Sequence, residues 1–235
     1  LGFPEAGRLL KPGRHTKILS LGNPIRPPDA GIDAAASRAR FNLSPDAVVL
    51  LVVGGSQGSR AVNEALLGAL EKVARGELPG RPDRLEIVWA TGPNHIDGIA
   101  ARLQPLGLPW VHAHGYIDAM PEALAATDVA VTRAGAMATA ELLAWGRPML
   151  LVPLPTAAAD HQTHNARALQ EAGAGVILSS HLLGLVEELC SRILVIQQGR
   201  MVAMGSMGDI VASKPELAGR GLEDVFLALT GQAGA

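Results

Sequence analysis

The sequence predicts an α/β protein built on a doubly wound parallel sheet, with an appended C-terminal tail of helix, hairpin and helix. Short apolar runs alternate with segments whose apolar residues recur at the spacing of one helical face. The apolar residues are mainly Ala, Leu and Val, which suit buried strands covered by helices. From Ser179 onward this alternation gives way to a hairpin pattern. Alternating strands and helices favour right-handed βαβ units and therefore a parallel sheet.

The predicted strands of the sheet are short apolar runs bounded by loop residues. In chain order they are Ala47–Val53, Leu85–Ala90, Trp110–Ala113, Val129–Thr132, Met149–Val152 and Gly175–Leu178. The predicted helices between them are Asn63–Arg75, residues 95–104, Met120–Ala126, Ala136–Trp145 and Asp160–Ala172. Gly146, followed by Pro148, marks the end of the fourth of these helices. Every connection therefore contains a helix, as parallel pairing of successive strands requires.

The tail has a different pattern. Its predicted elements are a helix over Leu182–Cys190, strands over Arg192–Ile196 and Arg200–Met204 joined by a tight turn at Gln197–Gly199, a short helix near 207–213 and a helix over 222–229. A hairpin added to a parallel αβ unit is a change of architecture. We therefore predict two domains, residues 1–178 and residues 179–235.

Composition limits the classes of function. Hydrophobic residues make up 48% of the chain, charged residues 18%, and the net charge is −2, so we expect no nucleic-acid partner. No apolar run reaches the roughly 18 residues that predict a transmembrane segment. Cys190 is the single cysteine, which excludes an internal disulfide and fits a reducing cytosol. The chain begins at Leu1 without a Met, so we interpret it as part of a longer protein.

Gly54–Ser59, with the sequence GGSQGS, lies directly between a predicted strand and a predicted helix. Glycines let the backbone approach a ligand closely, and free N–H groups at a helix start attract anions. In an open α/β sheet this strand end is where ligands bind. The pattern is neither the GxGxxG of dinucleotide sites nor the GxxxxGK(S/T) of NTP-binding loops. The alternative, a glycine-rich turn that only allows close packing, stays open.

Thr132–Glu141 places small residues at the start of a second predicted helix. Such a helix end presents unpaired N–H groups suited to a diphosphate. Glu141 lies one turn into the helix, where a carboxylate can accept hydrogen bonds from both hydroxyls of a ribose. The alternative is an acid that only complements the helix dipole, worth about 0.3–1 kcal/mol. The second glycine-rich loop at the same sheet edge favours the ribose interpretation.

A third polar motif, Asp160–Ala166, opens the last predicted helix of the first domain. The amide of Gln162 can donate and accept at once, which suits the hydroxyls of a sugar. His161 and His164 are spaced like a pair of metal ligands but lack the further acidic or cysteine ligands that a metal site needs. We therefore expect a sugar-binding group here and no metal.

In this order and spacing, the motifs of residues 1 to about 178 resemble the C-terminal, donor-binding domain of the MurG family. These are the two-domain GT-B N-acetylglucosaminyltransferases that convert lipid I to lipid II in peptidoglycan synthesis. The segments that carry the resemblance are Gly22–Arg26, Gly54–Ser59, Gly115–Met120, Arg133–Met137, Asp160–Gln162 and Asn165–Ala166. The resemblance implies the Rossmann-like fold of a GT-B C-terminal domain.

The resemblance implies a role for each residue of a donor site. Arg26 and Ser56 would contact the nucleotide of UDP-N-acetylglucosamine, and the backbone of Ile117 would meet the uracil edge. Gln162 would hold the hydroxyls of the N-acetylglucosamine. The diphosphate and ribose would be wrapped by consecutive residues, namely Ala136, Met137, Ala138, Thr139, Ala140 and Glu141. Ala138 stands where relatives often have Thr, which removes one expected hydroxyl contact with phosphate.

The resemblance further implies an inverting transferase that moves N-acetylglucosamine from its UDP donor to lipid I, with neither a cofactor nor a metal. The family's acceptor domain, which should carry the general base, is missing from these 235 residues, so we assign no catalytic residue. The family's location implies a cytoplasmic protein, peripheral at the inner face of the cell membrane. The alternative is a fragment that binds the nucleotide sugar without transferring it.

The tail resembles a different family. Residues from about 175 are similar to the C-terminal end of an ABC-transporter ATP-binding subunit, through Val176–His181, Leu185–Cys190, Gln198–Arg200 and Leu222–Thr230. His181 matches that family's switch histidine, but the phosphate-binding loop, acidic strand end and signature motif are absent from the sequence. We interpret the chain as chimeric, from a spliced or misassembled reading frame; an ABC-ATPase fragment is the less favoured function.

Overall fold

The computed structural model describes residues 7, 13, 16–19, 21–154, 157, 161–171, 176–178, 193–197, 200–217 and 219–230. The chain divides into two compact units, Leu1–Ile177 and Leu178–Ala235. The helix predicted over Leu182–Cys190, the residues Gln198 and Gly199 of the predicted turn, and His181 lie outside the described residues.

The first unit is built on a six-stranded sheet with the order β3-β2-β1-β4-β5-β6. The strands are β1 (Val48–Val53), β2 (Leu85–Ala90), β3 (Val111–His114), β4 (Val129–Thr132), β5 (Met149–Leu151) and β6 (Val176–Leu178). The pairs from β3 through β5 are parallel. The chain builds outward from β1 to β3 and then returns to place β4 on the other side of β1. Ligands bind at such a reversal in open α/β sheets, beyond the carboxyl ends of the strands.

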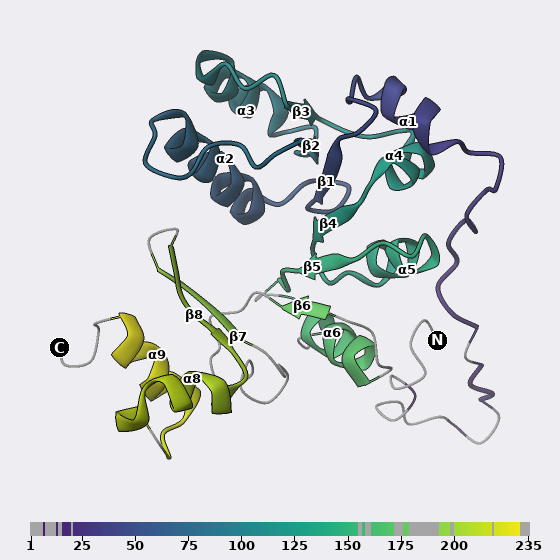
Figure 1. The fold of residues 1–235 in the computed structure, drawn as a ribbon. Helices are drawn as coiled ribbons and strands as arrows, with labels where there is room; N and C mark the ends of the chain where they lie inside the picture. The colour runs from purple at the N-terminus through teal and green to yellow at the C-terminus, as the bar shows by residue number, and fades with distance from the viewer. Residues whose placement is uncertain are drawn as a thin grey trace. The chain divides into compact units, whose positions relative to one another are not determined.

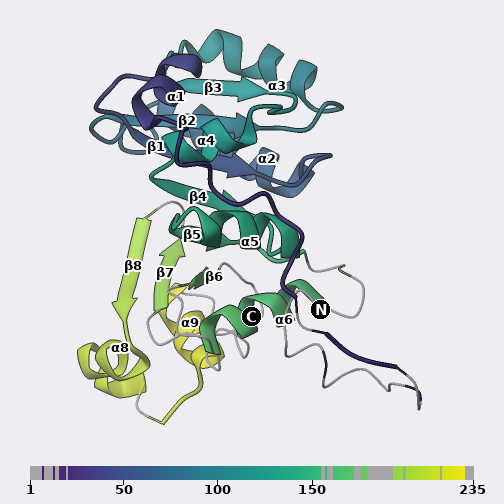
Figure 2. The same cartoon turned by 90° about the vertical axis from the view of Figure 1, so that its right-hand side faces the viewer.

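Helices cover both faces of this sheet (Figure 1). On one face lie α2 (Arg60–Ala74) and α3 (Ile96–Leu103), and on the other α1 (Ala34–Arg40), α4 (Met120–Ala126) and α5 (Ala136–Ala144). Figure 2, seen from the side of α4 and α5, shows α2 behind the strands. The last helix of the unit is α6 (His161–Glu171). The predicted doubly wound α/β fold is confirmed.

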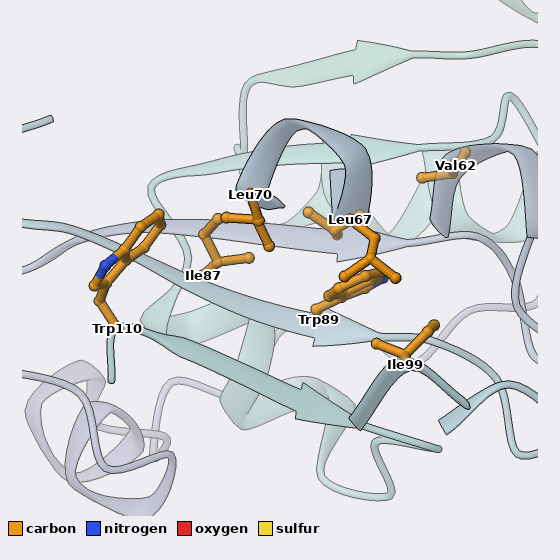
Figure 3. Packing of buried hydrophobic residues seen from close by; sticks show 8 residues of the cluster. Val62, Leu67, Leu70, Ile87, Trp89, Ile99 and Trp110 are labelled. Carbon is orange, nitrogen blue, oxygen red and sulfur yellow. The ribbon is translucent and has the colours of Figure 1, made fainter. Parts of the chain in front are cut away.

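The core beneath α2 joins this helix to the centre of the sheet (Figure 3). Leu67 of α2 and Trp89 of β2 both belong to this cluster, and both side chains are fully buried. The indole N–H of Trp89 donates to Asn63 Oδ1 at 3.0 Å, and Asn63 Nδ2 donates to the Thr91 carbonyl at 2.7 Å. Because both buried polar groups are paired, neither leaves an unsatisfied donor or acceptor in this apolar core. This packing holds the start of α2 against the carboxyl end of β2.

The helices of the structure differ from the prediction in two places. Helix α2 begins at Arg60 rather than Asn63, because the Ser59 hydroxyl accepts from the Val62 N–H at 3.4 Å and caps it earlier. Helix α1 was not predicted at all. Its cap is Asp33, whose carboxylate accepts from the Ala36 N–H at 2.6 Å.

The second unit contains an antiparallel hairpin of β7 (Ile193–Gln197) and β8 (Arg200–Gly205), followed by α8 (Met207–Ser213) and α9 (Leu222–Thr230). The predicted hairpin and the two closing helices are confirmed. One face of the hairpin packs on both helices through a separate core of Ile193, Val195, Ile210, Leu217, Leu222, Val225 and Leu229. Among the helices of the described ranges, none has the length and apolar character needed to cross a membrane.

Candidate functional site

A pocket of about 810 Å³ opens at the carboxyl ends of β1 and β4, where the strand order reverses. Its walls are the loops that follow β1, β3, β4 and β5, together with the starts of α2, α5 and α6. Seven residues that the sequence predicts as ligand contacts line it, namely Ser56, Ile117, Ala136, Met137, Ala138, Glu141 and Gln162. The fold thus brings together segments from four separate connections.

The Gly54–Ser59 loop combines the two interpretations that its sequence left open. Gly58 has φ +75°, and a Cβ atom there would lie 1.9 Å from the Thr91 carbonyl oxygen, so this glycine is required for close packing. Gly55 has φ +103° and nothing within 4 Å of its would-be Cβ. Gly55 and the exposed Ser56 both line the pocket. Close packing therefore explains why residue 58 is a glycine, while Gly55 and Ser56, in the middle of the loop, face the pocket.

The N-terminus of α5 is open toward the pocket. Its N-cap residue, Gly135, has extended backbone and provides no side chain that could accept from the first N–H groups. The first three helical residues, Ala136, Met137 and Ala138, all line the pocket. Helix α2, by contrast, is capped by Ser59. Uncapped N–H groups at the start of a helix favour an anion, so this wall of the pocket suits a negatively charged group.

Arg133 lies directly after β4, in the Arg133–Met137 motif, and has no role in the predicted site. Its Nε and Nη2 donate to Ser59 Oγ at 3.1 and 2.7 Å, and its Nη1 donates to the carbonyls of Val152 and Pro153 at 3.1 and 3.0 Å. Burial lowers the pKa of the Arg133 guanidinium. No carboxylate of the described residues lies within ion-pair distance of it. A half-buried cation without a counter-ion thus lines the pocket.

Glu141 lines the same pocket from the second turn of α5. Its side chain is half-buried, and this burial raises the pKa of its carboxyl group. Within the described part of the chain no group donates a hydrogen bond to it. A desolvated carboxylate without donors is costly, so it favours a ligand that brings hydroxyl groups.

Gln162 and Ile117 border the pocket from opposite sides of the sheet centre. Gln162 Oε1 accepts from the Leu154 N–H at 2.9 Å, which fixes the side chain and leaves its amide N–H groups to donate. The side chain of Ile117 is buried in the loop after β3. Its own N–H and carbonyl make no backbone hydrogen bond with any described residue, so both are available to a ligand.

Three predicted contact residues are not among those that line the pocket. Thr139 is fully buried, and its hydroxyl donates to the Gly135 carbonyl at 2.9 Å within its own helix. Ala140 is half-buried beside it. Arg26 is exposed, but its segment is tied to the start of α5, because Asn23 Nδ2 donates to the Ala136 carbonyl at 3.2 Å.

Two of the described histidines lie in the sheet, on β3. Across the ranges that the structure describes, no group of three His, Cys, Asp or Glu side chains could hold a metal ion. His112 Nε2 lies 3.1 Å from Glu86 Oε2, near the amino ends of the strands. His114 packs edge-on against Phe41, with ring centroids 5.8 Å apart. Both of these histidines have structural contacts.

Comparison with known proteins assigns the family. Residues 49–215 match the family model described as the glycosyltransferase family 28 C-terminal domain. The chain belongs to this family. The family 28 match contains every predicted pocket residue from Ser56 to Gln162, begins after Arg26, and continues beyond residue 178 into the tail. The predicted resemblance to the MurG family is confirmed by the curated relatives.

A relative from Salinibacter ruber is 42% identical over 179 residues, which are 76% of this chain and 45% of the relative. A relative from Syntrophotalea carbinolica is 38% identical over 208 residues, 88% of this chain and 53% of the relative. Both carry the name UDP-N-acetylglucosamine–N-acetylmuramyl-(pentapeptide) pyrophosphoryl-undecaprenol N-acetylglucosamine transferase. The chain spans about half the length of the curated relatives it matches. The crystal structure of Acinetobacter baumannii MurG is similar with a TM-score of 0.46 and 28% identity, over 61% of this chain and 39% of that one.

Proposed function

We propose that this family 28 domain binds UDP-N-acetylglucosamine in the pocket at the carboxyl ends of β1 and β4. The observation that carries the proposal is the convergence of three groups on one pocket: the Arg133 guanidinium, which has only neutral partners among the described residues, the uncapped N-terminus of α5, and the Glu141 carboxylate, to which no described group donates. A diphosphate would pair with the first two and a ribose with the third. The volume of about 810 Å³ suits a ligand of this size.

Each part of the donor has a partner in this arrangement. The diphosphate would lie on the N–H groups of Ala136–Ala138, near Arg133. The uracil edge would pair with the free backbone of Ile117, and the N-acetylglucosamine with the amide N–H groups of Gln162. Arg26 and Ser56 would add contacts to the nucleotide. Thr139 and Ala140 would act through the helix backbone, because neither side chain lines the pocket.

In transfer, negative charge develops on the departing UDP. The N-terminus of α5 and the Arg133 guanidinium would stabilise this charge from fixed positions, which is the form of catalysis that needs no reorganisation. The names of the relatives give the transfer of N-acetylglucosamine to an N-acetylmuramyl-(pentapeptide) pyrophosphoryl-undecaprenol. We propose that the complete enzyme makes this transfer to lipid I, with inversion, in peptidoglycan synthesis. The general base and the lipid contacts would belong to an acceptor domain, at the inner face of the cell membrane.

A binding-only role is the second candidate, because the chain spans about half of its relatives. Both candidates predict that titration calorimetry detects binding of UDP and of UDP-N-acetylglucosamine. They also predict that ADP and ATP bind at least tenfold more weakly. Tighter binding of ATP would contradict both and would favour the ABC-ATPase interpretation of the tail. UDP release from the donor, measured with lipid I present, separates the two: turnover by the chain alone would exclude the binding-only role.

A further inference from the structure

A small cavity of about 30 Å³ lies beneath the donor pocket, between the β1–β4 pair and the helices α4 and α5. It shares Val53, Met120, Thr132, Ala138 and Glu141 with the pocket above it. A volume of this size is enough for a single water molecule. The cavity and the pocket are therefore neighbours that share part of their walls.

Two polar side chains line this cavity, and both lack hydrogen-bond partners among the described residues. Thr132, the last residue of β4, is 1% exposed, and its Oγ1 is buried without a partner. Glu141 enters the cavity from α5, and its carboxylate also accepts no hydrogen bond from the described chain. The other walls are Leu, Val, Met and Ala side chains.

Unpaired buried hydroxyls are rare in folded proteins, because each one costs free energy that a water or a neighbouring group normally offsets. A water molecule in an otherwise apolar cavity needs at least two polar partners. Thr132 Oγ1 and the Glu141 carboxylate provide these two. The same water would satisfy the hydroxyl and donate to the carboxylate.

We infer that Thr132 is a positioning residue: through one water molecule held in this cavity, it orients the Glu141 carboxylate toward a ribose in the pocket. The inference rests on the proposed function, since Glu141 is given its ribose there. Thr132 itself would touch the bridging water rather than the ribose. Its effect on affinity should therefore depend on the ribose hydroxyls.

The test measures binding of UDP and of 2′,3′-dideoxyuridine 5′-diphosphate to the full chain by titration calorimetry. Thr132→Val removes the hydroxyl at nearly constant shape and should weaken UDP binding about five- to tenfold, the effect of one hydrogen bond. The dideoxy analogue should bind the variant and the unchanged chain equally. Thr132→Ser keeps the hydroxyl and should bind UDP within about twofold of the unchanged chain. The matched control is Thr127→Val, which removes a buried hydroxyl before β4 that donates to the Ala123 carbonyl at 2.6 Å.

The outcomes separate the inference from the proposed function. If the unchanged chain fails to bind UDP, both the proposed function and this inference are wrong. If the unchanged chain binds UDP, then equal affinity in Thr132→Val, or an equal loss for both ligands, overturns the inference alone. A high-resolution crystal structure provides a second measurement: a water within hydrogen-bond distance of Thr132 Oγ1 and Glu141 supports it, and a dry cavity overturns it.

Discussion

The guanidinium of Arg133 donates twice to the hydroxyl of Ser59, from Nε at 3.1 Å and from Nη2 at 2.7 Å. Ser59 also caps α2, and the remaining nitrogen of the guanidinium bonds to the carbonyls after β5. One cation therefore ties together three of the loops that form the donor pocket. Its charge remains available to a ligand because its partners are all neutral.

Replacing Arg133 by Met should weaken UDP binding about tenfold or more and lower the free energy of unfolding by about 1–3 kcal/mol, because charge-assisted hydrogen bonds are lost in both cases. Calorimetry and urea unfolding measure the two effects separately. The matched control is Arg102→Met, whose guanidinium forms surface ion pairs with Glu64 and Glu71. Such pairs contribute at most about 1 kcal/mol. Equal UDP affinity in the two variants would contradict the role of Arg133.

Replacing Glu141 by Gln should weaken UDP binding by about 1–3 kcal/mol if the carboxylate accepts from the ribose. The same change should stabilise the free protein at neutral pH. Burial raises the folded-state pKa of Glu141, so ionisation of Glu141 destabilises the fold; this penalty begins above the ordinary glutamate pKa and is complete above the raised folded value. The gain in melting temperature should disappear below the ordinary glutamate pKa of about 4.3. Unchanged affinity would reduce Glu141 to a residue that complements the helix dipole.

Gly58→Ala should destabilise the protein by about 2–5 kcal/mol, because the positive φ is unfavourable for alanine and its Cβ would overlap the Thr91 carbonyl. Gly68→Ala in α2 is the matched control. It lies at a helical position with nothing within 4 Å, and should stabilise by about 0.5–1 kcal/mol. Urea unfolding of both variants checks this. Similar stabilities would show that the loop can move away from Thr91, just after β2, without cost.

Ser44→Ala should destabilise the protein by about 1–3 kcal/mol at pH 7. Burial alone would raise the pKa of Glu86, but hydrogen bonds from Ser44 and His112 lower it overall. A lowered folded pKa contributes stability above about pH 4.3 that is lost as the pH falls through the folded value. The variant and the parent should therefore converge in acid. Ser37→Ala, whose hydroxyl donates to a backbone carbonyl at 2.7 Å, should show the same loss at both pH values.

A chain that ends after Leu178 should bind UDP within about threefold of the full chain, because the pocket is lined entirely by residues of the first compact unit. The family match continues to residue 215, so this truncation tests whether residues 179–215 complete the domain. Loss of binding by a truncated chain that still melts cooperatively would show that they do. It would also reject the boundary that we propose at residue 178.

The strands of the sheet can be predicted from the sequence because each is a short apolar run with loop residues such as glycine at its ends. The bounds of β2, α4 and β4 agree with the prediction at both ends. Helix α1 was missed because its signal is a single capping Asp33 before a short Ala-rich segment, and its ion pairs, Arg38–Asp128 and Arg40–Glu122, join residues far apart in the sequence.

The donor site was predicted less completely, for two physical reasons. The role of Arg133 depends on partners 74, 19 and 20 residues away, which no local pattern reports. Thr139 was expected at the ligand, yet its hydroxyl turns back to its own helix. Ala138 and Glu141, three residues apart, share the face of α5 that meets the pocket. Beyond the first turn of α5, where Ala136, Met137 and Ala138 all line the pocket, only the helix face that carries Glu141 reaches it, and Thr139 and Ala140 lie on other faces.

The two ends of the sheet carry different tasks. Ser44, Glu86 and His112 form their hydrogen-bonded cluster near the amino ends of the strands, while the donor pocket occupies the carboxyl ends. Changes at sites without shared partners combine almost additively. A mutation that alters the choice of donor at some cost in stability could thus be compensated by a second mutation at the far end, leaving the binding groups untouched. If the proposed function holds, this separation would allow the specificity of the pocket to change while the stability of the fold is kept.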